Sequence, residues 1–344
     1  MKKIVLVIKD AYSWAGTENI CNFMSECLGD EHEVFVYSLE GAGEPFYPFE
    51  KVKQIVSFAG EKNPIRSAVQ RINQQNFDAV FLISMGRLSV MFALWSLLSL
   101  RKKKAKTYAC EHIAINSFSK PIKLLKYLFL RYYDRVLVLT EKDEKVLTQW
   151  GIPAKTIPNP IVYKNYQRTE RTFQALAVGR LDFQKGFDLL LDVWKGFQAT
   201  NPQWKLVIAG DGELKNELVA KASALDISDS VSFVGKVANI NDYYRDSDMA
   251  LMTSRYEGLP LVLLEAKSWA LPVVAYDCPT GPQEIINNNQ DGFLVAMNDR
   301  AGFIEKMNQL AHNDELFFAM SEKTRTTALK FDGNVIKQSW LALV

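Results

Sequence analysis

Short apolar runs rich in β-branched residues alternate with longer amphipathic stretches along the first half of the chain. A short apolar run bounded by turn residues predicts a strand, and apolar positions three or four residues apart predict a helix. The predicted strands are Ile4–Ile8, Val34–Tyr37, Ala79–Ile83, Lys106–Cys110 and Val136–Leu139. The predicted helices span 17–28, 64–75, 87–100, 119–133 and 141–149.

The alternation is interrupted at Ile157-Pro158-Asn159-Pro160 and in the polar stretch Lys164–Thr172, and it then resumes. Two prolines so close together exclude a helix and suit a connection between domains. The second series of predicted strands is Phe173–Val178, Lys205–Ala209, Val231–Val234, Met249–Met252 and Val273–Tyr276. The predicted helices of this half lie near 186–199, 212–224, 238–246, 260–270, 299–311, 314–330 and 334–343.

This order of elements predicts an α/β protein with two Rossmann-like, doubly wound domains, each built on a parallel sheet. We expect the first domain over 1–160 and the second over 171–328, with a C-terminal helix at about 330–344 that packs back on the first. A chain of 344 residues suits two domains of roughly 100–200 residues each. Such a pair places a ligand in the cleft between the domains, beside the carboxyl ends of the strands.

Composition narrows the class of protein without naming a reaction. Hydrophobic residues make up 48% and charged residues 23% of the chain, the balance of a folded soluble protein. A net charge of only +2 gives no support to nucleic-acid binding. The four cysteines lack CxxC spacing, which argues against a zinc site and indicates buried apolar residues in a reducing, cytoplasmic compartment.

The most apolar segment, residues 88–100, is followed by a run of cations at 101–104. A membrane-spanning helix needs about 20 apolar residues, so this segment is too short to span a bilayer. We interpret it as a buried helix. The alternative is a re-entrant segment, or one that touches a membrane.

The loop Val178–Gly186 follows a predicted strand and leads into a predicted helix. It carries Arg180 and Lys185, a forked donor and a point charge that together suit phosphate oxygens. The flanking glycines and the position after a strand favour a phosphate site over the alternative, a pair of solvated surface cations.

A second loop, Tyr256–Glu265, also follows a predicted strand. Pro260 suits the first position of a helix, where its missing N–H costs nothing. The N–H groups of Gly258, Leu259 and Leu261 would then form a site for an anion at the helix start.

Two carboxylates, Glu257 and Glu265, flank that helix start. Glu265 lies among apolar residues, where an unpaired carboxylate is costly, and a ribose diol would supply two donors to it. One alternative makes Glu257 a helix cap and Glu265 a surface residue. Another makes them the acid and nucleophile of a glycosidase. The neighbouring cationic loop favours sugar transfer over hydrolysis.

The chain resembles the retaining glycosyltransferases of family 4, which have the GT-B fold of two Rossmann-like domains facing each other across a cleft. The resemblance rests on Gly179–Gly186, the pair Glu257–x7–Glu265, Cys278–Val295, Ala209–Glu213 and Ile157–Ile161. It implies transfer of a sugar from a nucleotide sugar, expected to be a UDP-hexose or UDP-N-acetylhexosamine. The implied acceptor is a glycan or lipid-linked saccharide in the synthesis of a surface polysaccharide such as capsule or lipopolysaccharide.

The resemblance also implies roles for individual residues. Arg180 and Lys185 would bind the donor diphosphate, and Glu265 would hold the ribose hydroxyls. Glu257 would contact the donor sugar, and the nucleotide base would pack near Val234. The donor-binding set is completed by the helix-start residues Gly258, Leu259, Pro260 and Leu261.

In the first half, the resemblance assigns a phosphate-facing loop to Ala15-Gly16-Thr17-Glu18. Ala15 replaces a family glycine and Asn19 a family arginine, so a cationic contact is missing there, while Gly16 and Thr17 remain donor-binding candidates. His112 matches a histidine that lines the donor-sugar pocket, and with Glu257, Arg180 and Lys185 it completes the predicted catalytic set. The alternative is a loop histidine with a structural hydrogen bond.

No metal and no cofactor is expected, because the cations and the helix start would stabilise the departing diphosphate electrostatically. The segment Asp246-Ser247-Asp248 is similar to the DxD metal motif of another glycosyltransferase fold. Asp248, however, begins a predicted buried strand, and the family carries a structural aspartate there. Retention by front-face attack is implied, and the chain offers no obvious nucleophile.

Residues 101–135 hold ten cations and two acids. Within this region, Lys120, Lys123, Lys126 and Arg131 fall within about 140° of a helical wheel, opposite apolar residues. One interpretation is an ordinary amphipathic helix with an apolar core face and a solvated basic face. The other is a patch that attracts an anionic membrane and brings the enzyme, on the inner face of the cytoplasmic membrane, to a lipid-linked acceptor.

Two other functions stay open on the same fold. One is a nucleotide-sugar epimerase, which would isomerise the sugar without releasing the nucleotide. The other is a non-catalytic protein that binds nucleotide sugars, which the intact set of Arg180, Lys185, Glu257 and Glu265 argues against.

Overall fold

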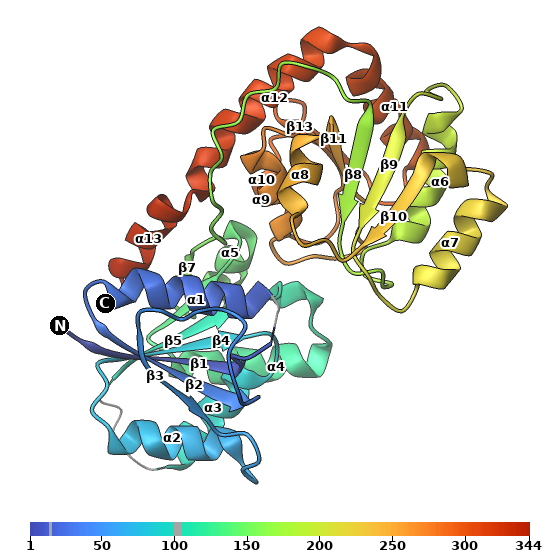
Figure 1. Cartoon of the computed structure of the whole chain (residues 1–344). Helices are drawn as coiled ribbons and strands as arrows, with labels where there is room; N and C mark the ends of the chain where they lie inside the picture. Colours follow the sequence, from blue (N-terminus) through green and yellow to red (C-terminus); the bar gives the residue numbers. More distant parts are fainter. Residues whose placement is uncertain (14–15, 100–104) are drawn as a thin grey trace. The chain divides into compact units, whose positions relative to one another are not determined.

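The computed structural model describes residues 1–13, 16–99 and 105–344. The chain divides into two compact units. Unit 1 comprises Met1–Pro160 and Asn334–Val344, and unit 2 comprises Ile161–Gly333 (Figure 1). Within the described ranges, every helix is too short or too polar to cross a bilayer.

Unit 1 is built on a seven-stranded parallel sheet with strand order β3-β2-β1-β4-β5-β6-β7. The strands are β1 Lys3–Asp10, β2 Glu33–Glu40, β3 Val52–Ser57, β4 Ala79–Ser84, β5 Lys106–Glu111, β6 Arg135–Val138 and β7 Ala154–Thr156. The helices are α1 Gly16–Gly29, α2 Pro64–Gln74, α3 Leu88–Leu98, α4 Lys120–Phe129, α5 Glu141–Gln149 and, from the C-terminal end, α13 Gly333–Leu341.

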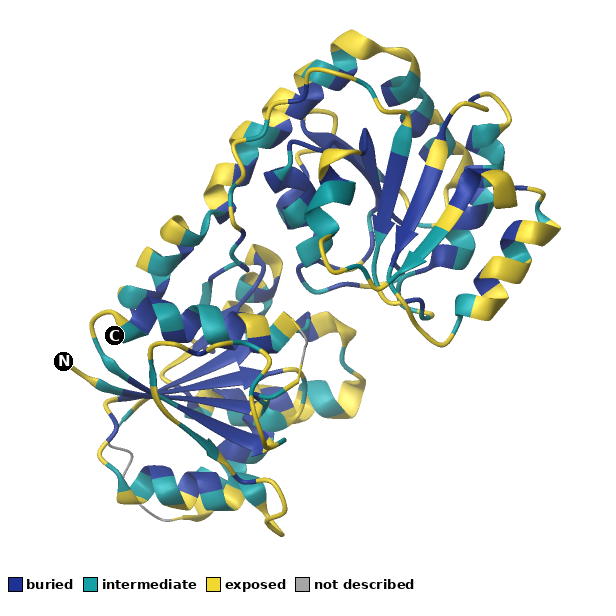
Figure 2. Cartoon of the chain, viewed as in Figure 1, coloured by how far each residue is buried: buried dark blue, intermediate teal, exposed yellow. Residues whose placement is uncertain are grey.

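Both faces of this sheet are buried, because helices cover each of them (Figure 2). Alternate residues of β1 enter two different apolar cores: Ile4, Leu6 and Ile8 face one, and Val5 and Val7 face the other. The first core is closed by α1 and α13, and the second by α2 and α3 (Figure 1).

Unit 2 is built on a six-stranded parallel sheet with strand order β10-β9-β8-β11-β12-β13. The strands are β8 Gln174–Val178, β9 Lys205–Ala209, β10 Val231–Gly235, β11 Met249–Met252, β12 Val273–Tyr276 and β13 Gly292–Val295. The helices are α6 Phe187–Gln198, α7 Lys215–Ala224, α8 Ile240–Arg245, α9 Leu261–Ser268, α10 Pro282–Ile285, α11 Arg300–His312 and α12 Asp314–Ala328.

The predicted fold class is confirmed, since both units are parallel α/β sheets covered by helices. Four elements were not predicted. The edge strand β3 is only half-buried and lacks a fully apolar run, β7 has three residues, and α10 has four. Strand β13 lies in a stretch that was recognised as a family motif and given no secondary structure.

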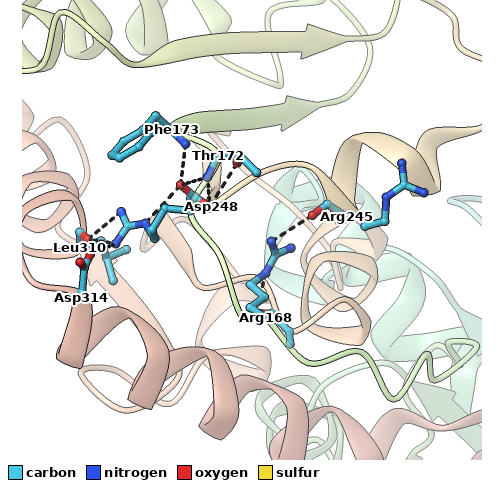
Figure 3. A network of polar contacts seen from close by, with 9 residues as sticks. Arg168, Thr172, Phe173, Arg245, Asp248, Leu310 and Asp314 are labelled. Carbon is cyan, nitrogen blue, oxygen red and sulfur yellow. Dashed lines mark hydrogen bonds and ion pairs between the residues drawn. The ribbon is translucent and has the colours of Figure 1, made fainter.

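The polar stretch 164–172 is firmly attached to unit 2, although its composition suggested a plain connection between domains. The buried guanidinium of Arg168 donates from Nε to the carbonyl oxygen of Ala270 at 3.1 Å, beyond the end of α9. It also donates to the carbonyl oxygens of Tyr244 at 2.6 Å and Arg245 at 3.1 Å, at the end of α8 (Figure 3). Arg168 therefore ties together the carboxyl ends of two helices.

A second polar centre in Figure 3 surrounds Asp248, immediately before β11. The buried carboxylate accepts hydrogen bonds from the backbone N–H groups of Thr172 and Phe173 and from Nε of Arg171. Arg171 also pairs with Asp314 at 2.9 Å. These bonds anchor the start of β8 to the start of β11 and use the oxygens that a metal ion would need.

Candidate functional site

Strands β8 and β11 are neighbours in unit 2, so the loops 179–186 and 253–260 leave the same edge of the sheet side by side. Gly186 caps α6 with φ of 65°, in the left-handed region that favours glycine. A side chain at this position would overlap the carbonyl oxygen of Thr253. The Thr253 hydroxyl also donates to the carbonyl oxygen of Gly186 at 2.8 Å, and the two loops are thereby held in contact.

An ion pair between Lys185 and Glu257 links the two loops. The sequence analysis assigned both residues to the donor site. Nζ of Lys185 lies 2.7 Å from Oε1 of Glu257, and the two side chains are 16% and 7% exposed. Lys185 and Glu257 are therefore largely buried, and a small part of each side chain remains in contact with solvent. A ligand that reaches this position would meet a cation and a carboxylate side by side.

Arg180, the other predicted phosphate cation, has a side chain that is 74% exposed and pairs with Asp182 at 3.1 Å. Arg255 is held more firmly, because it contacts Asp188 at 2.6 Å and donates to the carbonyl oxygen of Phe183. The sequence analysis did not single out Arg255. The structure shows that it braces the 179–186 loop from the neighbouring loop.

The start of α9 differs from the prediction by one position. The helix begins at Leu261, and Pro260 is the N-cap residue with ψ of 110°, so Pro260 is not the first helical residue. Backbone hydrogen bonds between Glu257 and the segment Pro279–Thr280, at 2.7 and 3.0 Å, fix the turn that precedes the helix. The donor-binding roles of Gly258, Leu259, Pro260 and Leu261 stay predictions.

Glu265, in the middle of α9, accepts a hydrogen bond of 2.8 Å at Oε2 from the hydroxyl of Tyr244 on α8. Burial raises the pKa of Glu265, and the Tyr244 hydrogen bond opposes that rise. Burial raises the pKa of Tyr244 well above its usual range, so its hydroxyl stays protonated and donates. Among the described residues, none donates to Oε1 of Glu265, which leaves that oxygen for a ligand.

The predicted need of Glu265 for a donor is therefore partly met inside the protein. Tyr244 was missed because it lies on another helix, and only the packing of α8 against α9 brings the two side chains together. Val234, the predicted neighbour of the base, lies near the end of β10 at the same sheet edge, two strands away from β8.

The predicted residues of unit 1 are less clearly organised. Gly16 begins α1, and the Thr17 hydroxyl donates to the Glu18 carboxylate at 2.9 Å. Ala15, which completes the predicted loop, lies outside the described residues. Nothing in these contacts identifies a phosphate site.

His112 follows β5, and its backbone N–H donates to the carbonyl oxygen of Ser84 at 3.0 Å. Its ring Nε2 is buried without a hydrogen-bond partner among the described residues. The residue His112 also lines a cavity of about 10 Å³, together with Trp340 and the segment Pro158–Pro160. Burial lowers the pKa of His112 to about 4, so the ring is neutral at pH 7. A neutral ring can still exchange hydrogen bonds with a sugar hydroxyl.

Next to His112, Glu111 is buried and pairs with Lys126 of α4 at 2.7 Å, with both side chains 0% exposed. Both interpretations of the sequence, a solvated basic face and a membrane-binding patch, placed Lys126 on the exposed side of the helix, and this placement is wrong. The lysine turns inward because Glu111, the Ser89 hydroxyl and the Phe118 ring surround its ammonium group. Arg101 to Lys104, which belong to the predicted basic region, lie outside the described residues.

The described part of the chain contains no group of three side chains suited to a metal ion. The four cysteines are free and buried, and burial raises the pKa of Cys21, Cys27, Cys110 and Cys278. They behave as small core residues and not as nucleophiles.

The chain is similar to known glycosyltransferases in sequence and to solved structures in fold. The family model described as "Glycosyl transferases group 1" matches residues 163–327, which lie within unit 2. The chain is 34% identical to the amylovoran biosynthesis glycosyltransferase AmsD of Erwinia amylovora over 99% of both chains. It is 26% identical, over 100% of this chain and 98% of the other, to an α-1,4-N-acetyl-D-galactosaminyltransferase of Campylobacter jejuni whose name includes an undecaprenol-linked saccharide.

Solved structures show the same fold at low identity. The Anabaena protein HepE in complex with UDP matches with a TM-score of 0.83 and 17% identity, over 100% of this chain and 99% of the other. The lipopolysaccharide outer core galactosyltransferase WaaB matches with a TM-score of 0.79 and 19% identity, over 98% of both chains.

Proposed function

Because the chain belongs to the glycosyl transferases of group 1, we propose that it transfers a sugar, with retention, from a UDP-hexose or UDP-N-acetylhexosamine to a surface glycan or its lipid-linked precursor. The observation that carries this proposal is the contact of Lys185 with Glu257 at the shared edge of β8 and β11. It joins a cation for a phosphate and a carboxylate for a sugar hydroxyl in one place.

In the proposed reaction, the bond between the anomeric carbon and the β-phosphate oxygen breaks, and the acceptor oxygen bonds to the same carbon. The acceptor proton passes to the departing diphosphate. Lys185 moves from Glu257 to the diphosphate, and Arg180 joins it from the surface. In this scheme, the two cations stabilise the negative charge that develops on the departing diphosphate, without a metal ion.

Glu257, released from Lys185, would accept a hydrogen bond from the donor sugar. Glu265, oriented by Tyr244, would hold the ribose hydroxyls through its second oxygen. Neither carboxylate acts as a nucleophile in this scheme. His112 would contact the donor sugar as a neutral imidazole, in line with the effect of burial on its pKa.

The names of the relatives support the choice of substrates. The Campylobacter relative is named for a saccharide on undecaprenol diphosphate, and AmsD for amylovoran biosynthesis. HepE binds UDP in its solved structure. We therefore propose a UDP-sugar donor and an acceptor presented at the inner face of the cytoplasmic membrane.

The test is to incubate the protein with a panel of nucleotide sugars, with and without lipid-linked saccharides, and to measure UDP release. Release that depends on the acceptor supports the proposal, and the anomeric coupling in the product's proton spectrum reports retention. Isomerised sugar without UDP release would show an epimerase instead. Donor binding without either product would show a binding protein.

A further inference from the structure

Helix α4 exposes its apolar side chains and buries a charged one. Leu124 is 60% exposed and Leu128 is 54% exposed, and Leu125 and Tyr127 are exposed beside them. These four residues are named the α4 surface. Lys126, on the opposite side of the same helix, is fully buried.

The buried ion pair fixes this orientation. Lys126 contacts the Glu111 carboxylate at 2.7 Å, and its ammonium lies 4.5 Å from the centre of the Phe118 ring. Glu111 in turn accepts a hydrogen bond of 2.5 Å from Ser89 of α3. Turning α4 to hide its leucines would leave both charges of the pair without partners, which is far more costly than exposing apolar area. The helix is thus locked with its apolar side outward.

Exposed apolar residues are also found nearby. The last turn of α3, a helix that packs against α4, leaves Leu97 and Leu98 exposed. Apolar residues scattered singly on a surface need no explanation, but four within five positions of one helix indicate a binding surface. In unit 2, Val219 and Leu329 are exposed singly on separate elements, α7 and the turn that follows α12.

The charges around the α4 surface identify the partner. From His112 to Tyr133 the sequence contains no acid, whereas Lys120 and Lys123 stand at the start of α4 and Arg131 follows its end. The Arg131 guanidinium lies 3.9 Å from the centre of the Tyr127 ring and donates to the carbonyl oxygens of Tyr127 and Trp150, and Arg131 as a residue is exposed. Leucines bordered by cations, with a tyrosine among them, suit the boundary between lipid headgroups and acyl chains.

We propose that α4 lies in the surface of an anionic membrane, with the α4 surface among the upper acyl chains and Lys120, Lys123 and Arg131 at the headgroups. The membrane interpretation of the sequence relied on electrostatic attraction between lysines and anionic lipid. With Lys126 buried and the leucines exposed, we propose that insertion of apolar side chains is the main contribution and that charge supports it. The proposal deepens the proposed function, because a lipid-linked acceptor would be presented at that surface, but the binding itself needs no substrate.

The experiment is flotation of the whole chain with vesicles of phosphatidylcholine alone, or mixed with phosphatidylglycerol, in the absence of nucleotide sugar. The double variant Leu124→Gln/Leu128→Gln removes the apolar insertion. The matched control Val219→Gln/Leu329→Gln alters two apolar side chains of unit 2 with 45% and 47% exposure. We expect the bound fraction on anionic vesicles to fall about tenfold in the first variant and to stay unchanged in the control.

Two further arms decide the basis of binding. Lys120→Gln/Lys123→Gln should lower binding several-fold and weaken its dependence on salt. A nitroxide on Leu128→Cys, placed selectively because the native cysteines are buried, should become protected from water-soluble relaxation agents when anionic vesicles are added. A nitroxide that stays fully accessible on bound protein would overturn the insertion.

Other results would also overturn the proposal. If wild type and the leucine double variant float equally, the α4 surface does not carry the binding. If light scattering shows a wild-type dimer that the leucine variant dissociates, and no vesicles bind, the partner is a second copy of the chain. Because UDP release with a water-soluble acceptor is measured separately, a failure of membrane binding is distinguishable from a failure of the proposed transferase activity.

Discussion

Among the Lys–Glu ion pairs of the described residues, one in each unit has the same length in a very different setting. In unit 1, Lys126 and Glu111 meet at 2.7 Å with no exposure of either side chain. In unit 2, Lys185 and Glu257 also meet at 2.7 Å, but both side chains keep some contact with solvent. The first pair is sealed under a helix, and the second joins two loops at the edge of a sheet.

We call Lys126–Glu111 the sealed pair and Lys185–Glu257 the open pair. The sealed pair supports the fold, and in the proposed function the open pair receives the donor. Charges sealed in the interior depend on each other, and removing one leaves the other without solvation. Lys185 keeps 16% of its side chain exposed, so its ammonium group can be reached by a diphosphate from solution. The family model covers unit 2, which holds the open pair, while the sealed pair supports the α4 surface in unit 1.

The largest effect is expected from Lys126→Ala, which leaves Glu111 buried and unpaired. The free energy of unfolding should fall by about 3–5 kcal/mol, the usual cost of breaking a buried pair from one side. Denaturant unfolding followed by circular dichroism measures the change. Lys120→Ala, which alters an exposed lysine of the same helix, is the control. If the two variants were equally stable, the sealed pair would not hold the fold.

The sealed pair also has an internal control. In Lys126→Met/Glu111→Leu both charges are removed, so most of the lost stability should return. Continued instability of the double variant would mean that packing of the lysine stem, and not the unpaired charge, causes the loss.

For the open pair, Lys185→Ala should act on turnover. We expect kcat for UDP release to fall about 100-fold, because one preorganised charge at the leaving group is lost. The free energy of unfolding should also fall, but by less than in Lys126→Ala, because Lys185 and Glu257 are 16% and 7% exposed whereas Lys126 and Glu111 are 0% exposed. Lys195→Ala, in the last turn of α6, is the control for charge removal in the same unit. Near wild-type turnover in Lys185→Ala would refute the phosphate assignment.

The sequence analysis placed Lys185 and Glu257 in neighbouring loops of one site without predicting their ion pair, and it did not bring Lys126 and Glu111 together at all. Lys185 and Glu257 each follow a strand, and parallel strands bring such loops to one edge, so local patterns predicted their proximity. Lys126 was assigned to the surface because lysines rarely lie inside, and its burial depends on Glu111 from a strand. Tyr244 was missed for the same reason, because its contact with Glu265 exists only in the packed fold.

A smaller effect is expected from Tyr244→Phe, which removes the hydrogen bond to Glu265. A bond to a charged group is worth about 1.5–3 kcal/mol, so the KM for the nucleotide sugar should rise about tenfold or more while kcat changes less. Burial raises the pKa of Glu265 and the Tyr244 bond opposes it, so the variant's carboxyl will protonate at a higher pH. The KM should therefore rise on acidification from a higher pH than in wild type.

The pH dependence distinguishes positioning of Glu265 from a general loss of structure. A misfolded variant would lower activity at every pH, whereas a mispositioned and more basic Glu265 should recover toward high pH. Glu265→Gln, which cannot ionise, should show a raised KM without this acidic limb. If the KM of Tyr244→Phe rose on acidification at the same pH as in wild type, Tyr244 would not act on the donor site through Glu265.

The smallest effect is expected from removal of metal ions. If the open pair supplies the cation for the departing diphosphate, then EDTA should change UDP release by less than about twofold, since Lys185 and Arg180 provide the stabilising charge. Asp248, in the segment that is similar to a metal motif, has its oxygens engaged by Arg171 and two backbone N–H groups. Loss of activity with EDTA and its return with Mg²⁺ would show that the open pair is not sufficient. It would also mean that a metal ion held by a carboxylate near the donor, and not Lys185 alone, stabilises the diphosphate.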